Sequence, residues 1–153
     1  MGVDISVFPL DQSPGFLIHR LDTLLSAGLH RALLAEGFDL TAEQWGVLSR
    51  LWEVEGLCQA DLATRTAKDR HNMTRILHLL EKNGYILREP DPNDRRCSIV
   101  FLTDLGRGLQ EKLTPLVLEF LEKCFRGLAA EDLARLRTWH ETIVANLESL
   151  PRD

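Results

Sequence analysis

The sequence lacks the features of several protein classes. It contains no stretch near the ~18 consecutive apolar residues of a transmembrane helix, and residues 1–10 lack the basic segment of a secretion signal. A composition of 44% hydrophobic and 27% charged residues over 153 positions also argues against an intrinsically disordered chain. We therefore expect a globular cytoplasmic protein with no membrane partner.

Motifs for catalysis and for metal or cofactor binding are also absent from the sequence. It has no glycine-rich phosphate loop, no zinc-type cysteine spacing and no nucleophile motif. His71 and His78 share a helical face, but their separation exceeds the i, i+4 spacing of helical metal ligands. We expect no enzyme activity, no metal and no cofactor.

Cysteine is scarce, and the three residues present are Cys58, Cys97 and Cys124, which form no C-x-x-C motif. Packing as free thiols is the simpler role for them in a cytoplasmic chain. The alternative is redox sensing. Cys97 is then a candidate, because the preceding Arg95 and Arg96 would lower the pKa of its thiol.

The net charge of −5 argues at first against a nucleic-acid partner, but the charge is unevenly distributed. Residues 65–96 contain eight lysines and arginines and five acidic residues, a net charge of +3, while the rest of the chain carries −8. DNA responds to local potential and not to the total. The basic segment is therefore compatible with a nucleic-acid partner.

Hydrophobic periodicity predicts a mainly α chain with one small antiparallel β hairpin. The predicted helices cover about residues 14–35, 42–55, 59–66, 70–82, 104–126 and 130–149, and the predicted strands cover 85–88 and 97–102. Helix starts are indicated by the capping sequence Thr41 to Gln44 and by Asp69 and Thr103. The order is a helix-turn-helix followed by a two-stranded wing, with long helices on either side.

The predicted helix 70–82 has two different faces. Its apolar face consists of Met73, Ile76, Leu77 and Leu80, and its polar face consists of His71, Thr74, Arg75, His78 and Lys82. Such a polar face is often only a solvated surface. The wing arginines and the helix-turn-helix order favour DNA binding instead.

Several motifs in this order resemble the MarR (multiple antibiotic resistance regulator) family of bacterial transcription factors. They are Leu40-Thr-x-x-Gln44-Trp-x-x-Leu48, Gln59-Ala-Asp-Leu62-Ala, Met73-Thr-Arg-x-Leu77-x-x-Leu80-Glu-x-x-Gly84-Tyr-Ile, Arg88, Asp91-Pro-Asn-Asp94-Arg-Arg96 and Leu102-Thr-x-x-Gly106. The resemblance covers about residues 14–150. It implies a dimeric winged-helix regulator, here expected to be a repressor, that a small aromatic or phenolic effector releases from DNA.

The resemblance implies a single domain over residues 1–153. Within it, residues 14–36 and 104–150 would form the dimerisation helices and residues 41–103 the winged helix-turn-helix lobe. Leucine-rich helices outside the basic segment agree with an interface between two copies, although they could also pack within one chain. Two-fold symmetry predicts a pseudo-palindromic operator on double-stranded DNA.

The helix after the turn is expected in the major groove and the wing in the minor groove. The predicted DNA contacts are Arg65, Thr66, Lys68, Arg70, His71, Asn72, Thr74, Arg75, His78, Arg95 and Arg96. Asn72 suits adenine and an arginine suits guanine. Asp94 is expected to orient Arg96 or an arginine of the recognition helix by a charge-assisted hydrogen bond, unless it is simply a turn residue.

In the family that the chain resembles, the effector lies between the dimerisation helices and the DNA-binding lobe. The residues matching that position are Phe16, His19, Arg20, Thr23, Trp45 and Leu48. A cation or imidazole beside aromatic rings suits an aromatic carboxylate. The alternatives are that the tryptophans belong to the core and that Arg20 is a surface charge. A redox-sensing regulator of the same fold and a winged-helix protein-interaction module are the other functions to consider.

Overall fold

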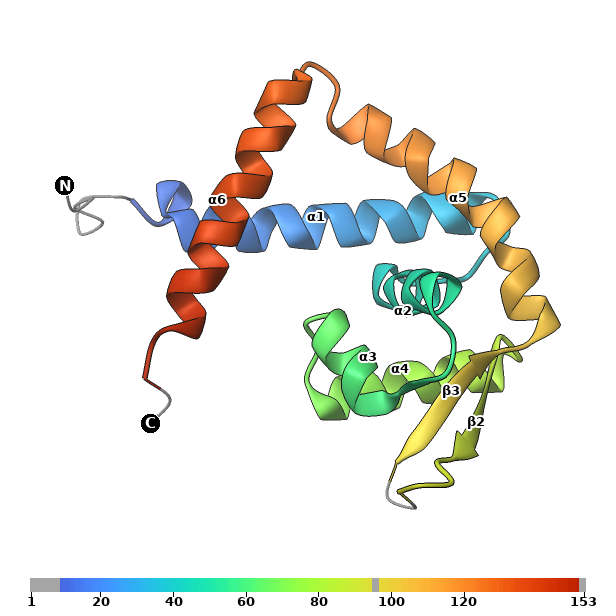
Figure 1. Ribbon diagram of the computed structural model, residues 1–153. Helices are drawn as coiled ribbons and strands as arrows, with labels where there is room; N and C mark the ends of the chain where they lie inside the picture. The colour runs from blue at the N-terminus through green and yellow to red at the C-terminus, as the bar shows by residue number, and fades with distance from the viewer. Residues whose placement is uncertain (1–8, 95–96, 152–153) are drawn as a thin grey trace. The chain divides into compact units, whose positions relative to one another are not determined.

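The computed structural model describes residues 9–94 and 97–151, and it is mainly α with one small sheet (Figure 1). The elements are a short 3-10 helix (Leu10–Gln12), α1 (Pro14–Ala35), α2 (Ala42–Glu53), β1 (Leu57–Cys58), α3 (Gln59–Arg65), α4 (Arg70–Lys82), β2 (Ile86–Pro90), β3 (Ser98–Leu102), α5 (Asp104–Cys124) and α6 (Ala130–Glu148). All six predicted helices are confirmed. The chain comprises two compact units, residues 1–120 and 121–153.

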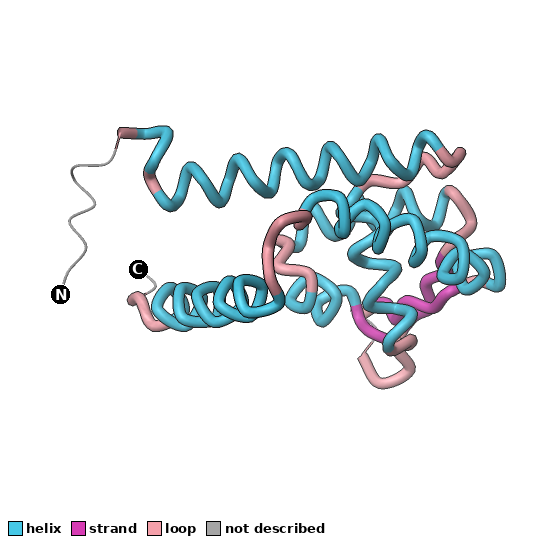
Figure 2. The backbone as a smooth tube through the Cα atoms, turned by 90° about the horizontal axis from the view of Figure 1, so that it is seen from above, coloured by secondary structure: helices cyan, strands magenta, loops and turns pink. Residues whose placement is uncertain are grey.

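The sheet is larger than the sequence predicted. β2 and β3 form the expected antiparallel hairpin, but β1 pairs with the other edge of β3, which gives the strand order β1-β3-β2. Figure 2 shows these strands as the small magenta part of a largely helical unit. The predicted hairpin is confirmed, but β1 was not predicted, because a two-residue strand is too short to produce a periodic signal.

Local hydrogen bonds confirm the predicted helix starts. Thr41 and Gln44 cap each other reciprocally at the start of α2, with Gln44 N donating to Thr41 Oγ1 at 3.2 Å. Asp69 Oδ1 accepts from Asn72 N at 2.8 Å, and Thr103 Oγ1 accepts from Gly106 N at 3.1 Å. These caps satisfy backbone N–H groups that helix ends leave unpaired.

The core of the first unit lies where α2, α3 and α4 meet the sheet, and α1 and α5 add buried side chains to it. Its completely buried side chains include Leu33, Leu40, Val47, Leu48, Leu51, Leu62, Met73, Leu77, Leu80, Val100 and Leu113. The alternative that the tryptophans belong to the core needs correction for Trp45 and Trp52, because both are only half-buried. Val47 takes the core position on α2, and Trp52 Nε1 donates to Gly106 O at 3.0 Å.

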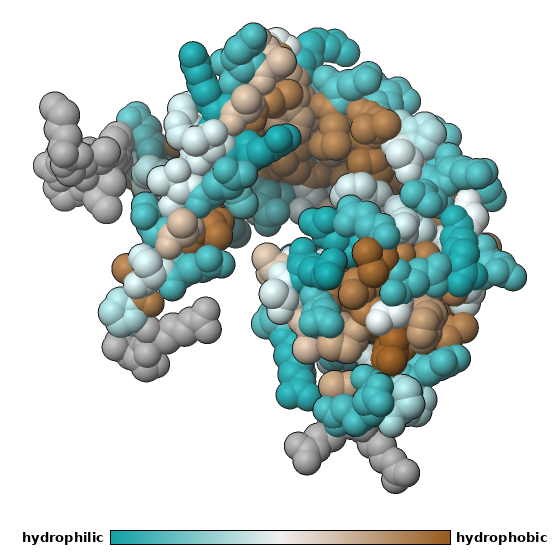
Figure 3. Space-filling view, viewed as in Figure 1, coloured by the Kyte–Doolittle hydropathy of each residue, from teal (hydrophilic) through white to brown (hydrophobic). Residues whose placement is uncertain are grey.

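Helix α6, in the second unit, has no buried residue. Its large apolar side chains are exposed and recur at three- and four-residue spacing, and apolar groups are visible along its surface in Figure 3. They include Leu133, Leu136, Trp139, Ile143 and Leu147. Helix α1 likewise exposes Leu17, Ile18, Leu21 and Leu24. Each helix therefore carries an apolar stripe that its own unit leaves uncovered.

Candidate nucleic-acid interface

Helix α4 presents a polar face to solvent because its other face is completely used in the core. Met73, Ile76, Leu77 and Leu80 are each at most 1% exposed. The opposite side bears five of the predicted DNA contacts in exposed positions: Arg70, His71, Thr74, Arg75 and His78. Burial thus orients these side chains away from the protein and toward any partner of α4.

Three of the predicted DNA contacts are held by a carboxylate that the sequence analysis did not select. Glu43 Oε1 lies 2.9 Å from Lys68 Nζ and accepts from Asn72 Nδ2 at 3.0 Å. Glu43 Oε2 accepts from Arg75 Nη2 at 2.9 Å, and the same nitrogen donates to Asn72 Oδ1 at 2.8 Å. We refer to Glu43, Lys68, Asn72 and Arg75 as the Glu43 cluster.

The Glu43 cluster keeps its carboxylate ionised. The hydrogen bond from Lys68 is the largest cause that lowers the pKa of Glu43, and Asn72 and Arg75 lower it further, whereas burial opposes them. Glu43 was not predicted as a site residue because it lies inside the capping sequence from Thr41 to Gln44. An acidic residue in the first turn of a helix is already explained by local structure.

Two other predicted contacts have bonds within the protein. Thr66 Oγ1 donates to Leu62 O at 2.7 Å, which uses its hydroxyl hydrogen at the end of α3. Thr74 Oγ1 donates to Arg70 O at 3.0 Å and accepts from Gln59 Nε2 at 2.7 Å. Gln59 therefore connects α3 to the polar face of α4. This contact was also not predicted from the sequence. Arg65 is exposed at the end of α3.

At the wing, Arg95 and Arg96 lie outside the described residues, so the expected bond from Asp94 to Arg96 stays a prediction. The described part of this turn holds Cys97 against Asp94. Cys97 N donates to Asp94 O at 2.9 Å, and the thiol lies 3.6 Å from Asp94 Oδ2. Asp91 Oδ1 accepts from Asn93 N at 2.7 Å, which closes the turn further.

The expected lowering of the Cys97 pKa is wrong. Desolvation raises the pKa of this thiol, and the carboxylates of Asp94 and Asp91 raise it further. A raised pKa means less thiolate and less reactivity toward oxidants. Cys58 has a local role, because its sulfur accepts from Asp61 N at 3.4 Å and caps α3.

A cavity of about 630 Å³ lies between α1, α2 and the turn before α4, close to the predicted effector site. Trp45 lines it, and its indole Nε1 is buried without a hydrogen-bond partner in the described part of the chain. Arg65, Lys68 and Glu43 also line this cavity. The other predicted effector residues do not contribute. Leu48 is completely buried, and α1 presents Asp22 and Ser26 in place of Phe16, His19, Arg20 and Thr23.

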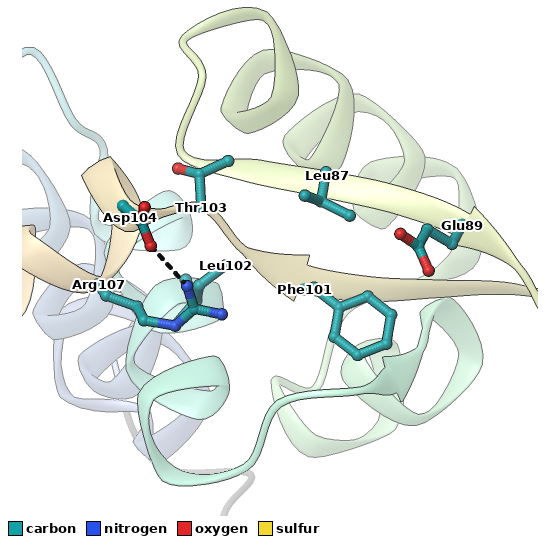
Figure 4. A pocket seen from close by; sticks show the side chains of 7 residues that line it. All are labelled: Leu87, Glu89, Phe101, Leu102, Thr103, Asp104 and Arg107. Carbon is teal, nitrogen blue, oxygen red and sulfur yellow. Dashed lines mark hydrogen bonds and ion pairs between the residues drawn. The ribbon is translucent and has the colours of Figure 1, made fainter.

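A second cavity, of about 470 Å³, lies beside the outer face of the sheet and the start of α5 (Figure 4). Leu87 and Phe101 line its apolar side, and Arg107 lies at the opposite end. The guanidinium of Arg107 is engaged by Asp104 at 3.1 Å and by Glu55 at 2.8 Å. Its charge is therefore already neutralised, and this cavity does not resemble an anion site.

Within residues 9–94 and 97–151, no group of three or more His, Cys, Asp or Glu side chains is arranged to hold a metal ion. No helix in the same residues has the length and apolar character needed to cross a membrane.

Comparison with known proteins identifies the family. Residues 40–98, which include the helix-turn-helix, β2, the first residue of β3 and the Glu43 cluster, match the MarR family. The chain contains a MarR-family domain. Its similarity to the mutant MarR of E. coli solved with operator DNA extends over 94% of this chain and 99% of that one, with 26% identity and a TM-score of 0.78.

Other transcriptional regulators are similar over different lengths. TtmR of Methylorubrum extorquens, a transcriptional regulator, is 42% identical over 84 residues, which are 55% of this chain and 43% of that protein. The transcriptional activatory protein BadR of Rhodopseudomonas palustris is 29% identical over 139 residues, 88% of this chain and 78% of BadR. The chain thus spans under half the length of TtmR but most of BadR.

A ligand-bound MarR-family structure shares the same fold. The PcaV transcriptional regulator of Streptomyces coelicolor, solved with its natural ligand, has a TM-score of 0.80 and 25% identity to this chain. The similarity covers 95% of this chain and 98% of the PcaV chain. These relatives are transcriptional regulators and not enzymes. The chain shares their fold.

Proposed function

We propose that this chain acts as a dimer that binds a pseudo-palindromic DNA operator through α4 and the wing. The observation that carries the proposal is the polar face of α4, whose arginines and histidines are exposed because the opposite face is buried. The operator complex of the E. coli protein of the same fold supports it. Acting on chromosomal DNA, the chain would work in the cytoplasm.

The proposed DNA contacts fall into two groups. Arg65, Arg70, His71 and His78 are exposed and directly available to bases or phosphates, whereas Thr74 is exposed but bonded to Arg70 and Gln59. Arg95 and Arg96 are added on the sequence argument alone. Lys68, Asn72 and Arg75 belong to the Glu43 cluster, and Thr66 carries a backbone bond.

An operator selected from random duplexes by the wild-type chain provides the test. We expect Arg70→Ala to weaken binding by about 1–3 kcal/mol, measured by fluorescence anisotropy at fixed salt. Lys112→Ala removes an exposed cation from α5 and serves as the control. We also expect affinity to fall steeply with salt, since each neutralised phosphate contributes about −0.9 to the logarithmic slope. A flat salt dependence would favour the protein-interaction module instead.

Residues 14–36 and 104–150 are proposed as the dimerisation helices and residues 41–103 as the DNA-binding lobe. The exposed apolar stripes of α1 and α6 support this division, because large uncovered apolar surfaces mark interfaces. We propose repression as the mode of regulation. The relatives include both the activatory BadR and the repressor IacR of Pseudomonas putida, so a reporter assay with and without the gene is the deciding measurement.

The cavity beside Trp45 is the proposed effector site. The exposed cation of Arg65 and the aromatic ring of Trp45 suit a small aromatic carboxylate or phenol. A panel of such compounds tested by thermal shift, and then for release of the selected operator, would identify it. Redox control through Cys97 is disfavoured by the raised pKa of its thiol.

A further inference from the structure

We propose that Glu43 is a positioning residue for DNA recognition, because its carboxylate and the Asn72 amide together fix the Arg75 guanidinium for base reading. This inference rests on the proposed function and adds a residue from outside the helix-turn-helix. Glu43 belongs to the first turn of α2, and Arg75 lies in the second turn of α4.

The bonds of Arg75 leave part of its guanidinium free. Glu43 Oε2 and Asn72 Oδ1 both accept from a single nitrogen, Nη2, at 2.9 and 2.8 Å. The Arg75 side chain remains 57% exposed. Nη2 uses both of its hydrogens in these bonds, so the two-pronged pairing with guanine, which needs Nη2, is not open to Arg75 in this arrangement. Nε and Nη1 keep N–H groups for single hydrogen bonds to base acceptors. Anchoring one nitrogen of a long flexible side chain fixes the direction in which the others point.

Asn72 has a different role from the adenine contact that its residue type suggests. Its Nδ2 donates to Glu43 Oε1 at 3.0 Å, and its Oδ1 accepts from Arg75 Nη2. The half-buried side chain thus uses both of its amide groups inside the protein. Asn72 connects Glu43 to Arg75, and Arg75, not Asn72, is the residue that contacts a base.

The negative charge of Glu43 also affects DNA binding. A carboxylate beside Lys68 and Arg75 opposes the phosphate backbone, and this repulsion weakens binding to any sequence. Orientation of Arg75 favours only the sequence that presents a base acceptor in the right place. The repulsion lowers affinity for every sequence, and the orientation of Arg75 raises the ratio of operator affinity to non-specific affinity.

The test measures that ratio with the selected operator and a shuffled duplex of the same length. For Glu43→Gln, we expect shuffled-duplex affinity to rise about twofold through charge removal, and the ratio to fall about tenfold. Glu111→Gln removes the same charge from an exposed position on α5 and should leave the ratio unchanged. Thermal unfolding of each variant verifies that it is folded.

A double-mutant cycle separates positioning from simple loss of structure. If Glu43 acts through Arg75, Glu43→Gln should not change the ratio further in an Arg75→Ala background. Equal ratios for Glu43→Gln and the wild type, or additive losses in the cycle, would overturn the inference. If the wild-type chain selects no sequence at all, the proposed function itself fails, which is a distinguishable result.

Discussion

At the scale of single residues, Gly106 is the position with the least room for change. A Cβ atom at this glycine would lie 2.0 Å from the backbone oxygen of Tyr85. That oxygen also accepts from Thr103 N at 3.0 Å, so it cannot move without disturbing the start of α5. The glycine allows α5 to approach the chain that enters β2.

We expect Gly106→Ala to lower the free energy of unfolding by about 2 kcal/mol or more, because the added methyl group must displace backbone. Gly108 offers a matched control in the same helix, since a Cβ there meets nothing within 4 Å. Gly108→Ala should stabilise the protein by about 0.5–1 kcal/mol through helix propensity. Urea denaturation followed by circular dichroism measures both, and equal effects would contradict the steric explanation.

At the scale of elements, the start of α4 depends on one side chain. Asp69 Oδ1 caps Asn72 N, and this backbone bond is the largest cause of the lowered pKa of Asp69. We expect Asp69→Ala to destabilise the protein by about 1 kcal/mol and Asp69→Asn to restore most of the loss. Chemical denaturation gives the free energies. Failure of asparagine to restore stability would show that the cap bond is not responsible.

Sequence patterns predicted the elements better than the contacts between them. Helix starts and apolar faces follow from residues three or four positions apart, which is why Thr41, Asp69 and Met73 were interpreted correctly. The bonds of Glu43 to Asn72 and Arg75 span 29 and 32 residues, and no local pattern reports such contacts. The α1 residues that line the cavity beside Trp45 differ from the predicted effector residues for a related reason. The choice between neighbouring positions on α1 depends on how α1 packs against α2.

At the scale of the whole molecule, α6 identifies a part of the protein whose stability we expect to depend on a second copy. Its apolar stripe has no cover within its own unit, where Leu136 and Ile143 are 42% and 43% exposed. Burial of such side chains between two chains would contribute about 1.5–3 kcal/mol for each.

We expect sedimentation to give a dimer for the wild type and a monomer for Leu136→Glu, whose operator affinity would also fall. Thr138→Glu introduces the same charge on the opposite side of α6 and should remain a dimer. A wild-type monomer at micromolar concentration, or a monomer produced equally by both variants, would contradict the assignment of α6 to the interface.

Lys68 links the cavity beside Trp45 to the Glu43 cluster, because it lines that cavity and pairs with Glu43 at the same time. An occupant that attracts Lys68 changes the pairing of the carboxylate that holds Arg75, so occupancy and DNA binding share one free energy of coupling. Thermodynamic linkage is reciprocal. A compound that weakens operator binding tenfold must itself bind tenfold more weakly to the operator complex, and its effective dose then depends on how many operators are present.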